Sequence, residues 1–128
     1  MRTSPKARGT RQETAVVRAA QTAGLIAERL AEGGSADRGD VRILTDVEWV
    51  GEVKDRERLN VHAELDKATR KAGTLNTFLV WRRMVRHDSG KRRTQEGPVI
   101  VAVTLPRFLE MLAESVDAPC PSCAGSLR

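Results

Sequence analysis

The spacing of hydrophobic and polar residues predicts that the chain begins with a helix. Apolar residues recur at helical spacing after Thr10-Arg11-Gln12-Glu13, which has the form of a capping box, so we expect a helix over residues 10–23. The mixed run over 25–30 is compatible with a strand or with an extension of this helix. Residues 1–9 are polar and basic, and we expect them to form a flexible arm.

Two apolar runs that follow predict a β-hairpin. Residues 41–44 and 47–53 flank a turn, and alternate residues of the second run fall on opposite faces of a strand. With the turn centred near Asp46, positions whose numbers add up to 92 face each other, so Asp40 lies opposite Glu52. A slip of one residue would send Asp40 to the other face, so this pairing depends on the register.

The second half of the chain has the pattern of a helix followed by two strands. Helical spacing covers residues 60–72. The nearly continuous apolar runs 78–81 and 99–103 are typical of strands covered on both faces, and we expect a charged loop over 86–97 between them. Pro106 suits the first turn of a final helix.

The order of these elements (α-β-β-β-α-β-β-α) predicts an α/β fold, with a central mixed five-stranded sheet flanked by helices. The chain of 128 residues is the size of one domain, which we place at residues 10–116. Residues 117–128 form a tail that carries Cys120 and Cys123. Because this pair supplies only two of the four ligands of a structural zinc site, we expect it to be unliganded unless two chains share a site.

Charge and motif content narrow the class of protein. Lysine and arginine total 22 against 17 aspartates and glutamates, and this basic balance is compatible with nucleic acid. No run approaches the roughly 18 apolar residues of a spanning helix, and no secretory segment or disulfide framework is evident, so we expect a cytoplasmic protein without a membrane partner. The patterns of nucleotide hydrolases, zinc proteases and serine esterases are absent.

Asp40, Glu52 and Lys54 form the candidate catalytic group. Glu52 and Lys54 are two residues apart on a strand and share a face, which Asp40 joins if the register holds. Two carboxylates hold a hard divalent cation and a nearby lysine orients water, which is the minimum for metal-dependent phosphodiester hydrolysis. The solvated face of a surface hairpin would explain the same charges without any chemistry.

These residues resemble a known nuclease motif. Gly39-Asp40 followed by Gly51-Glu52-Val53-Lys54 is similar to the PD-(D/E)xK motif, with glycine in place of the motif's proline. With the basic segment and helix upstream, Arg29 and Gly33-Gly34-Ser35, the chain resembles archaeal-type Holliday junction resolvases. It resembles more closely the short resolvase-like nucleases encoded by actinobacterial phages. The Gln-x-x-x-Tyr signature of RecB-type exonucleases is absent from residues 60–72.

The resemblance implies a restriction-endonuclease-like core that binds Mg²⁺ or Mn²⁺. Glu13, Asp40 and Glu52 would then be the metal ligands, and Lys54 would be the catalytic lysine. Ser35 would lie in the loop where resolvases carry a functional serine. A capping-box role would explain Glu13 without a metal.

Several basic residues are candidates for phosphate contacts, although solubility and internal ion pairs would also account for them. The densest basic region lies over residues 82–93. The residues that we expect to contact DNA are Arg8, Arg38, Arg56, Arg58, Arg82, Arg83, Lys91, Arg92 and Arg93.

We therefore expect a structure-selective DNA endonuclease, a Holliday junction resolvase that makes paired nicks in four-way junctions. Because such a junction has two-fold symmetry, we expect a homodimer that binds branched or double-stranded DNA. One alternative is another nuclease of this superfamily: a repair or restriction-like endonuclease, or an exonuclease. The other is a non-catalytic DNA-binding module on the same fold.

Overall fold

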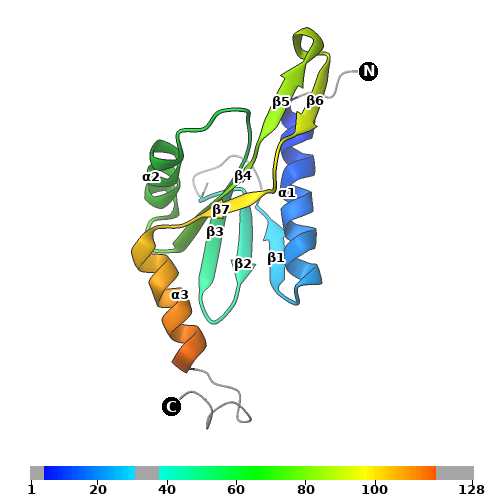
Figure 1. Cartoon of the computed structure of the whole chain (residues 1–128). Helices are drawn as coiled ribbons and strands as arrows, with labels where there is room; N and C mark the ends of the chain where they lie inside the picture. The colour runs from blue at the N-terminus through cyan, green and yellow to red at the C-terminus, as the bar shows by residue number, and fades with distance from the viewer. Residues whose placement is uncertain (1–4, 31–37, 118–128) are drawn as a thin grey trace.

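The computed structural model describes residues 5–30 and 38–117, which form a five-stranded sheet flanked by helices (Figure 1). Strands β3 and β4 are parallel, whereas the other neighbours in the sheet are antiparallel. The expected α/β fold with a mixed five-stranded sheet is therefore confirmed. In spatial order the strands are β1 (Ile26–Arg29), β2 (Val41–Leu44), β3 (Glu48–Asp55), β4 (Asn76–Arg82) and β7 (Ile100–Ala102).

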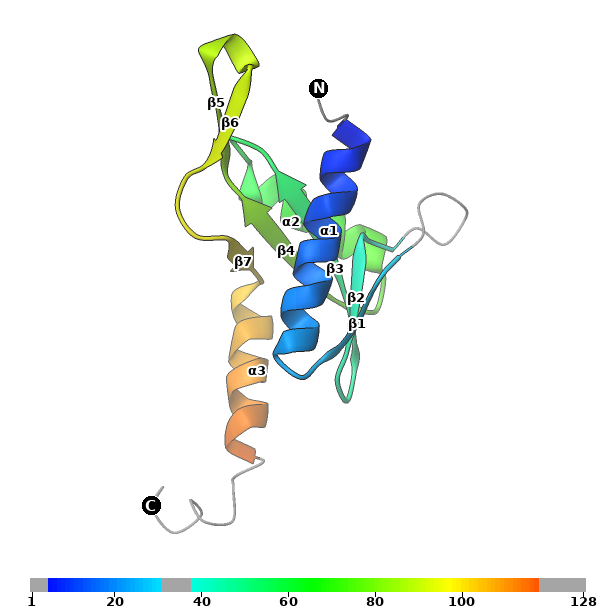
Figure 2. The same ribbon diagram turned by 90° about the vertical axis from the view of Figure 1, so that its right-hand side faces the viewer.

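Helices cover both faces of this sheet (Figure 2). Helix α1 (Pro5–Thr22) packs against β1, β2 and β3, whereas α2 (Val61–Ala72) packs against β3 and β4 from the other side. Helix α3 (Leu105–Asp117) follows β7 and extends away from the sheet. Pro106 lies in its first turn, as expected.

Helix α1 begins earlier than its sequence pattern suggests. The expected start at Thr10 is wrong, because the helix starts at Pro5 and residues 5–9 of the expected arm are helical. Proline fits a helix start, since its fixed φ is already helical and its missing N–H needs no partner there. Gly9 inside the helix costs only about 1 kcal/mol, which does not end it. Thr10 is therefore an interior residue, and a capping-box role for Glu13 is excluded.

The register of the β2–β3 hairpin is the predicted one. Val41 pairs with Gly51 and Leu44 pairs with Glu48, so paired residue numbers add up to 92. At Gly51, a Cβ atom would stand 2.2 Å from a ring carbon of Phe78. Glycine thus lets the Phe78 ring lie against the strand, where it joins the hydrophobic core between the sheet and α1.

The core has two layers, one on each face of the sheet. On the α1 side, Val17, Val41, Phe78 and Val80 form a buried cluster. On the α2 side, the completely or almost completely buried residues are Val50, Ala68 and Leu79. Because successive residues of a strand point to opposite faces, Glu52 follows Val50 onto the α2 side.

The basic region between β4 and β7 is a hairpin and not the expected loop. Strands β5 (Met84–His87) and β6 (Arg92–Gln95) pair in an antiparallel sheet of their own. Its tip, Asp88-Ser89-Gly90, bends through three residues with positive φ. Polar or charged residues occupy six of the eight positions in the two strands, for example in the pair Arg86 and Arg93, so no apolar alternation marks the strands in the sequence.

Strand β7 is also placed differently from the expectation. The apolar run 99–103 predicted a strand covered on both faces, but β7 lies at the edge of the sheet. Val99, Ile100 and Val101 are 47%, 44% and 62% exposed. Strand β4 instead matches its prediction, since its centre at 78–80 is buried between β3 and β7. The ambiguous run over 25–30 contains β1.

Candidate active site

Asp40 and Glu52 lie together where β2 begins and the adjoining part of β3 passes it. The Asp40 N–H donates to the Gly51 carbonyl at 2.9 Å, and the Asp40 Oδ2 accepts from the Val53 N–H at 2.8 Å. The aspartate is thus bonded to the main chain on both sides of Glu52. The Asp40 side chain continues the ladder by one step and fixes its carboxylate beside that of Glu52.

Glu52 is a buried carboxyl, with only 6% of the residue exposed. Burial raises the pKa of Glu52 above its ordinary value of 4.5, and the neighbouring Asp40 raises it further through a side-chain hydrogen bond and its negative charge. A hydrogen bond from Lys71 acts in the opposite direction. Two adjoining carboxyls of this kind favour a cation between them, because it removes their mutual repulsion.

Two lysines stand at this carboxylate pair. The Lys71 Nζ on α2 donates to Glu52 Oε1 at 2.8 Å. Lys54 lies two residues after Glu52 on the same face of β3, and its Nζ is 3.7 Å from Glu64 Oε2 on α2. Arg56 also reaches Glu64, at 3.5 Å. Glu64 therefore pairs with three basic side chains, Lys54, Arg56 and Lys67.

Lys71 and Glu64 were not among the site residues expected from the sequence. Both occupy the stripe of α2 that faces the sheet, at helical spacing with Ala68 and Ala72. Charged residues at core spacing on a helix are unusual, since an unpaired charge is costly to bury. That spacing is the signal that marks them in the sequence, although it does not say which strand residues they meet.

Glu13 is placed elsewhere. It is buried on α1, on the opposite side of the sheet, and its Oε2 accepts hydrogen bonds from Arg29 Nε at 3.2 Å and Nη2 at 3.1 Å. Within residues 5–30 and 38–117, no three carboxylate, histidine or cysteine side chains come together as a metal site. The three-ligand set of Glu13, Asp40 and Glu52 is therefore not assembled there, and two carboxylates remain.

The carboxylate pair fits a hard divalent cation with an incomplete protein shell. Mg²⁺ commonly binds through one or two carboxylates and completes its octahedron with water and substrate phosphate oxygens. Asp40 and Glu52 supply such a pair, and a bound cation would offset the burial and the Asp40 charge that raise the pKa of Glu52. A phosphate oxygen or water would have to replace the third expected ligand.

The basic β5–β6 hairpin is fastened to the end of the strand that carries this site. Arg93 Nη2 on β6 donates to Asp55 Oδ1 at 3.0 Å, and the Met84 N–H on β5 donates to the Arg56 carbonyl at 3.3 Å. Just before the hairpin, Trp81 Nε1 donates to the Arg56 carbonyl at 2.8 Å and Arg83 Nε donates to the Glu57 carbonyl at 3.1 Å. The hairpin projects past the ends of β3 and β4 (Figure 1).

The residues expected to contact DNA differ in what they can reach. Arg93 is mostly buried against Asp55, so its guanidinium secures the hairpin instead of facing solvent. Arg82 is half-buried and bonds Gln95 at 2.8 Å. The side chain of Arg8 and all of Ser35 lie outside the described residues. The exposed members of the set are Arg38, Arg56, Arg58, Arg83, Lys91 and Arg92.

No protein-family model and no curated protein sequence matches the chain. Among the described residues, no helix is long and apolar enough to cross a membrane. We therefore infer function from the carboxylate pair, its lysines and the basic hairpin beside them.

Proposed function

We propose that this protein is a Mg²⁺- or Mn²⁺-dependent DNA endonuclease that makes paired nicks in four-way junctions. The observation that carries the proposal is the buried Glu52 carboxyl held against Asp40, with Lys54 on the same strand face. A bound divalent cation would neutralise charge at the scissile phosphate and make a coordinated water more acidic.

The chain's own residues would have distinct tasks in this reaction. Asp40 and Glu52 would hold the cation. Glu64 keeps the Lys54 ammonium at the site, from which it would orient the attacking water or a phosphate oxygen. Lys71, which bonds Glu52 at 2.8 Å, provides a second positive charge close to the developing charge of the phosphate.

DNA as substrate is supported by the basic hairpin. Within residues 82–93, four exposed cations stand against a single acid, Asp88; they are Arg83, Arg86, Lys91 and Arg92. Such a surface binds phosphates without reading bases, which suits recognition of a branched structure by shape. The choice of a junction over other DNA follows from the resemblance of the 39–54 segment to resolvases.

The proposal is tested by incubating the protein with labelled four-way junction, linear duplex and single strand, with and without Mg²⁺ or Mn²⁺. We expect metal-dependent, symmetric nicks in the junction alone. Degradation from linear ends would identify an exonuclease, and cuts within the duplex would identify a restriction-like or repair endonuclease. Either result would refute the assignment as a junction resolvase, but it would still support Asp40, Glu52 and Lys54 as the active site.

Two ion pairs favour a second candidate, a DNA-binding module without activity. Lys71 forms an ion pair with Glu52, and Arg29 forms one with Glu13. Binding of the junction without cleavage under either metal would support this candidate.

We expect the hairpin to control how strongly binding depends on salt. Replacing the exposed Lys91 and Arg92 with glutamine should lower the slope of log affinity against log salt concentration by about 2, since each lost phosphate contact removes about one released counterion. The matched control replaces Arg18 and Arg70, two exposed cations on α1 and α2, and should leave the slope unchanged. Equal losses in both variants would mean that the hairpin has no special role.

We also expect Lys71 to compete with the metal. Replacing Lys71 with methionine should tighten Mn²⁺ binding about fivefold, because a partly exposed ion pair of roughly 1 kcal/mol no longer has to be broken. Isothermal titration of the metal-free protein at mildly alkaline pH measures this. Lys67→Met removes a charge one turn away, where the side chain is 68% exposed, and should have little effect. Unchanged affinity in Lys71→Met would contradict the competition.

A further inference from the structure

Helix α3 presents its apolar side to solvent. Its apolar residues at helical spacing are between 45% and 68% exposed. An amphipathic helix on a folded domain normally turns such a stripe toward the core. We call this the α3 stripe; it consists of Leu105, Phe108, Leu109, Leu112 and Val116.

The opposite side of α3 is the one that meets the sheet. The Arg107 guanidinium lies 5.9 Å from the centre of the Trp49 ring, and Glu114 lines the same region. Arg107 also bonds Glu110 at 2.6 Å on this polar side. The helix is thus held by its charged side, which leaves the α3 stripe uncovered.

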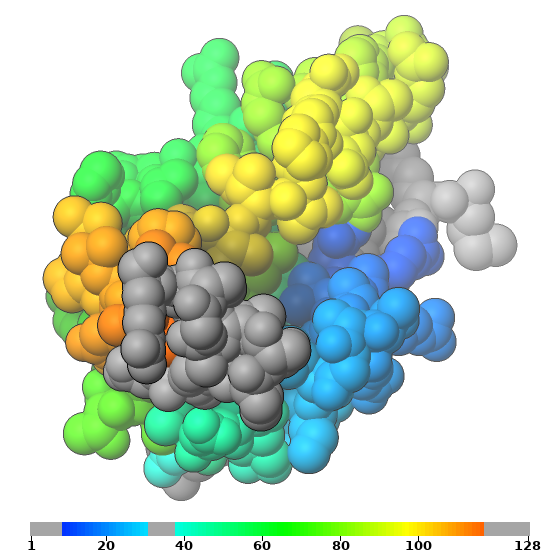
Figure 3. Space-filling model, turned by 60° about the horizontal axis from the view of Figure 1, so that its bottom comes forward, coloured from blue at the N-terminus to red at the C-terminus, as the bar shows by residue number. Residues whose placement is uncertain are grey.

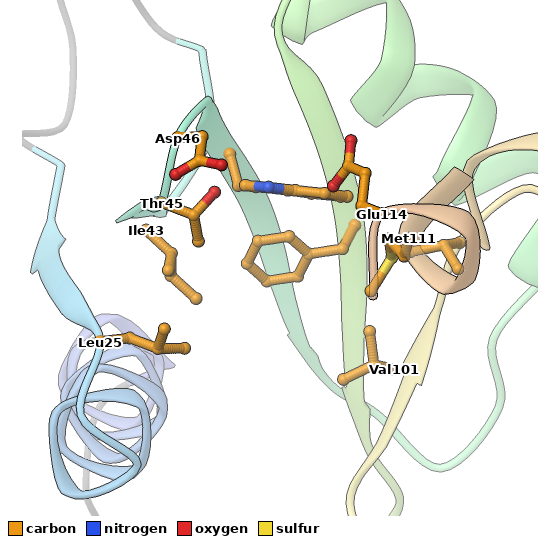
Figure 4. A pocket seen from close by; sticks show the side chains of 10 residues that line it. Leu25, Ile43, Thr45, Asp46, Val101, Met111 and Glu114 are labelled. Atoms are coloured by element: carbon orange, nitrogen blue, oxygen red, sulfur yellow. The ribbon is translucent and has the colours of Figure 1, made fainter. Parts of the chain in front are cut away.

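An apolar groove adjoins the stripe. It has a volume of about 450 Å³ and its floor includes Trp49 and Phe78, on the part of the sheet that α1 leaves open (Figure 4). Figure 3 shows α3 and the end of α1 on two sides of this end of the molecule. Met111 lines the groove and is one helical turn from Phe108, so the apolar part of the groove adjoins the stripe. The groove also has polar lining residues, namely Thr45, Asp46 and Glu114, and these are not part of the stripe.

Within the described residues, the α3 stripe stays exposed. Exposed apolar patches of this kind mark protein contacts. The occupant must therefore bring apolar side chains of its own.

The stripe suits a second copy of this chain. Its flanks carry Ala113 and Ser115, whereas the charged side chains described over residues 105–116 lie on the other side of the helix, at Arg107, Glu110 and Glu114. A two-fold contact places the same patch of both copies face to face. A charged residue near the centre of the patch would therefore be repelled by the same residue of the other copy. An uncharged stripe avoids this repulsion.

We propose that α3 is the surface through which two copies of the chain form a two-fold dimer. Antiparallel pairing of the stripes would place Leu109 opposite Leu112, with the groove edges of both copies closing over the ends. The biological need for two copies rests on the proposed function, because paired nicks require two active sites. The surface itself rests on the orientation of α3.

The test measures the mass of the full chain by sedimentation and by light scattering at micromolar concentration. We expect twice the chain mass of 14.1 kDa for the wild-type protein. Leu109→Glu combined with Leu112→Glu should weaken dimerisation at least a hundredfold and yield single chains. These side chains face solvent in one copy, so the circular dichroism spectrum should not change. Glu110→Gln, on the other side of the same helix, should remain dimeric.

A wild-type protein of single-chain mass at all concentrations would overturn the proposal, and so would a double variant that stays dimeric. A stripe that captures a different protein while the chain stays single would overturn it too. Asp40→Asn should remain a dimer, which separates assembly from catalysis. If the protein is a dimer but cuts no junction, the dimer surface stands and the proposed function is refuted. If single chains make paired nicks, the proposed function stands and the dimer surface is refuted.

Discussion

Replacing Asp40 with asparagine should abolish metal-dependent cleavage of a four-way junction. The amide oxygen of asparagine can still accept the hydrogen bond that the Val53 N–H donates at 2.8 Å, so the local fold should be kept. The substitution removes one of the two negative charges that would hold the cation. Metal charge stabilisation of several kcal/mol depends on that charge, so we expect a loss of about a thousandfold or more in the cleavage rate.

Junction binding should survive this substitution or become tighter, because a negative charge is removed from a surface that meets phosphates. Single-turnover cleavage of labelled junction and fluorescence anisotropy without metal measure the two properties separately. Asp46→Asn, at the exposed turn of the same hairpin, is the matched control and should cleave normally. Undiminished cleavage by Asp40→Asn would refute the role of this residue as a metal ligand.

Replacing Glu52 with glutamine should also remove cleavage, yet make the metal-free protein more stable at neutral pH. Burial and the neighbouring Asp40 raise the pKa of Glu52 above 4.5 in the folded state. A raised pKa means that the protonated carboxyl favours folding, and that this contribution is lost as the pH rises through the folded-state pKa. At neutral pH the charged form is therefore a cost, which the neutral glutamine does not carry.

We expect Glu52→Gln to raise the free energy of unfolding and the melting temperature of the metal-free protein at neutral pH. The difference should shrink as the pH falls through the raised folded-state pKa and vanish below pH 4.5, where the carboxyl is protonated in the folded and the unfolded state. Mg²⁺ should raise the melting temperature of the wild-type protein more than that of the variant.

Thermal unfolding between pH 4 and pH 8 tests this pattern. Glu48→Gln, four residues earlier on the same face of β3 and less buried, is the control and should show no such gain. A variant that is less stable than wild type at neutral pH would mean that the ion pair with Lys71 outweighs the cost of burying the Glu52 charge.

Much of the site's local geometry could be predicted because it depends on residues close in sequence. The hairpin register follows from a short turn and from the alternation of apolar residues, which together place Asp40 opposite Glu52. Lys54 shares a strand face with Glu52 because the side-chain period of a strand is two. The limits of α2 follow from Asn60, whose side chain accepts from the Ala63 N–H, and from Gly73.

Other features depended on contacts between distant segments. The meeting of Lys71 with Glu52 requires α2 to fold back over β3, and the pairing of Glu13 with Arg29 requires β1 to lie along α1. A helix pattern shows which side of a helix is charged, but not which strand that side will meet. For this reason the sequence could not show that Glu13 pairs with Arg29 instead of joining Asp40 and Glu52 as a third ligand.

The sequence by itself determined the order of most elements, the hairpin register and the shared face of Glu52 and Lys54, because turn chemistry and side-chain periodicity act over a few residues. The tertiary structure alone decided that β7 lies at the edge, that the basic segment over 84–95 is a hairpin, and that α3 turns its apolar stripe outward. The sequence of an apolar run is the same whether another segment of the same chain or a second copy of the chain covers it. Only packing between segments far apart in sequence distinguishes these cases.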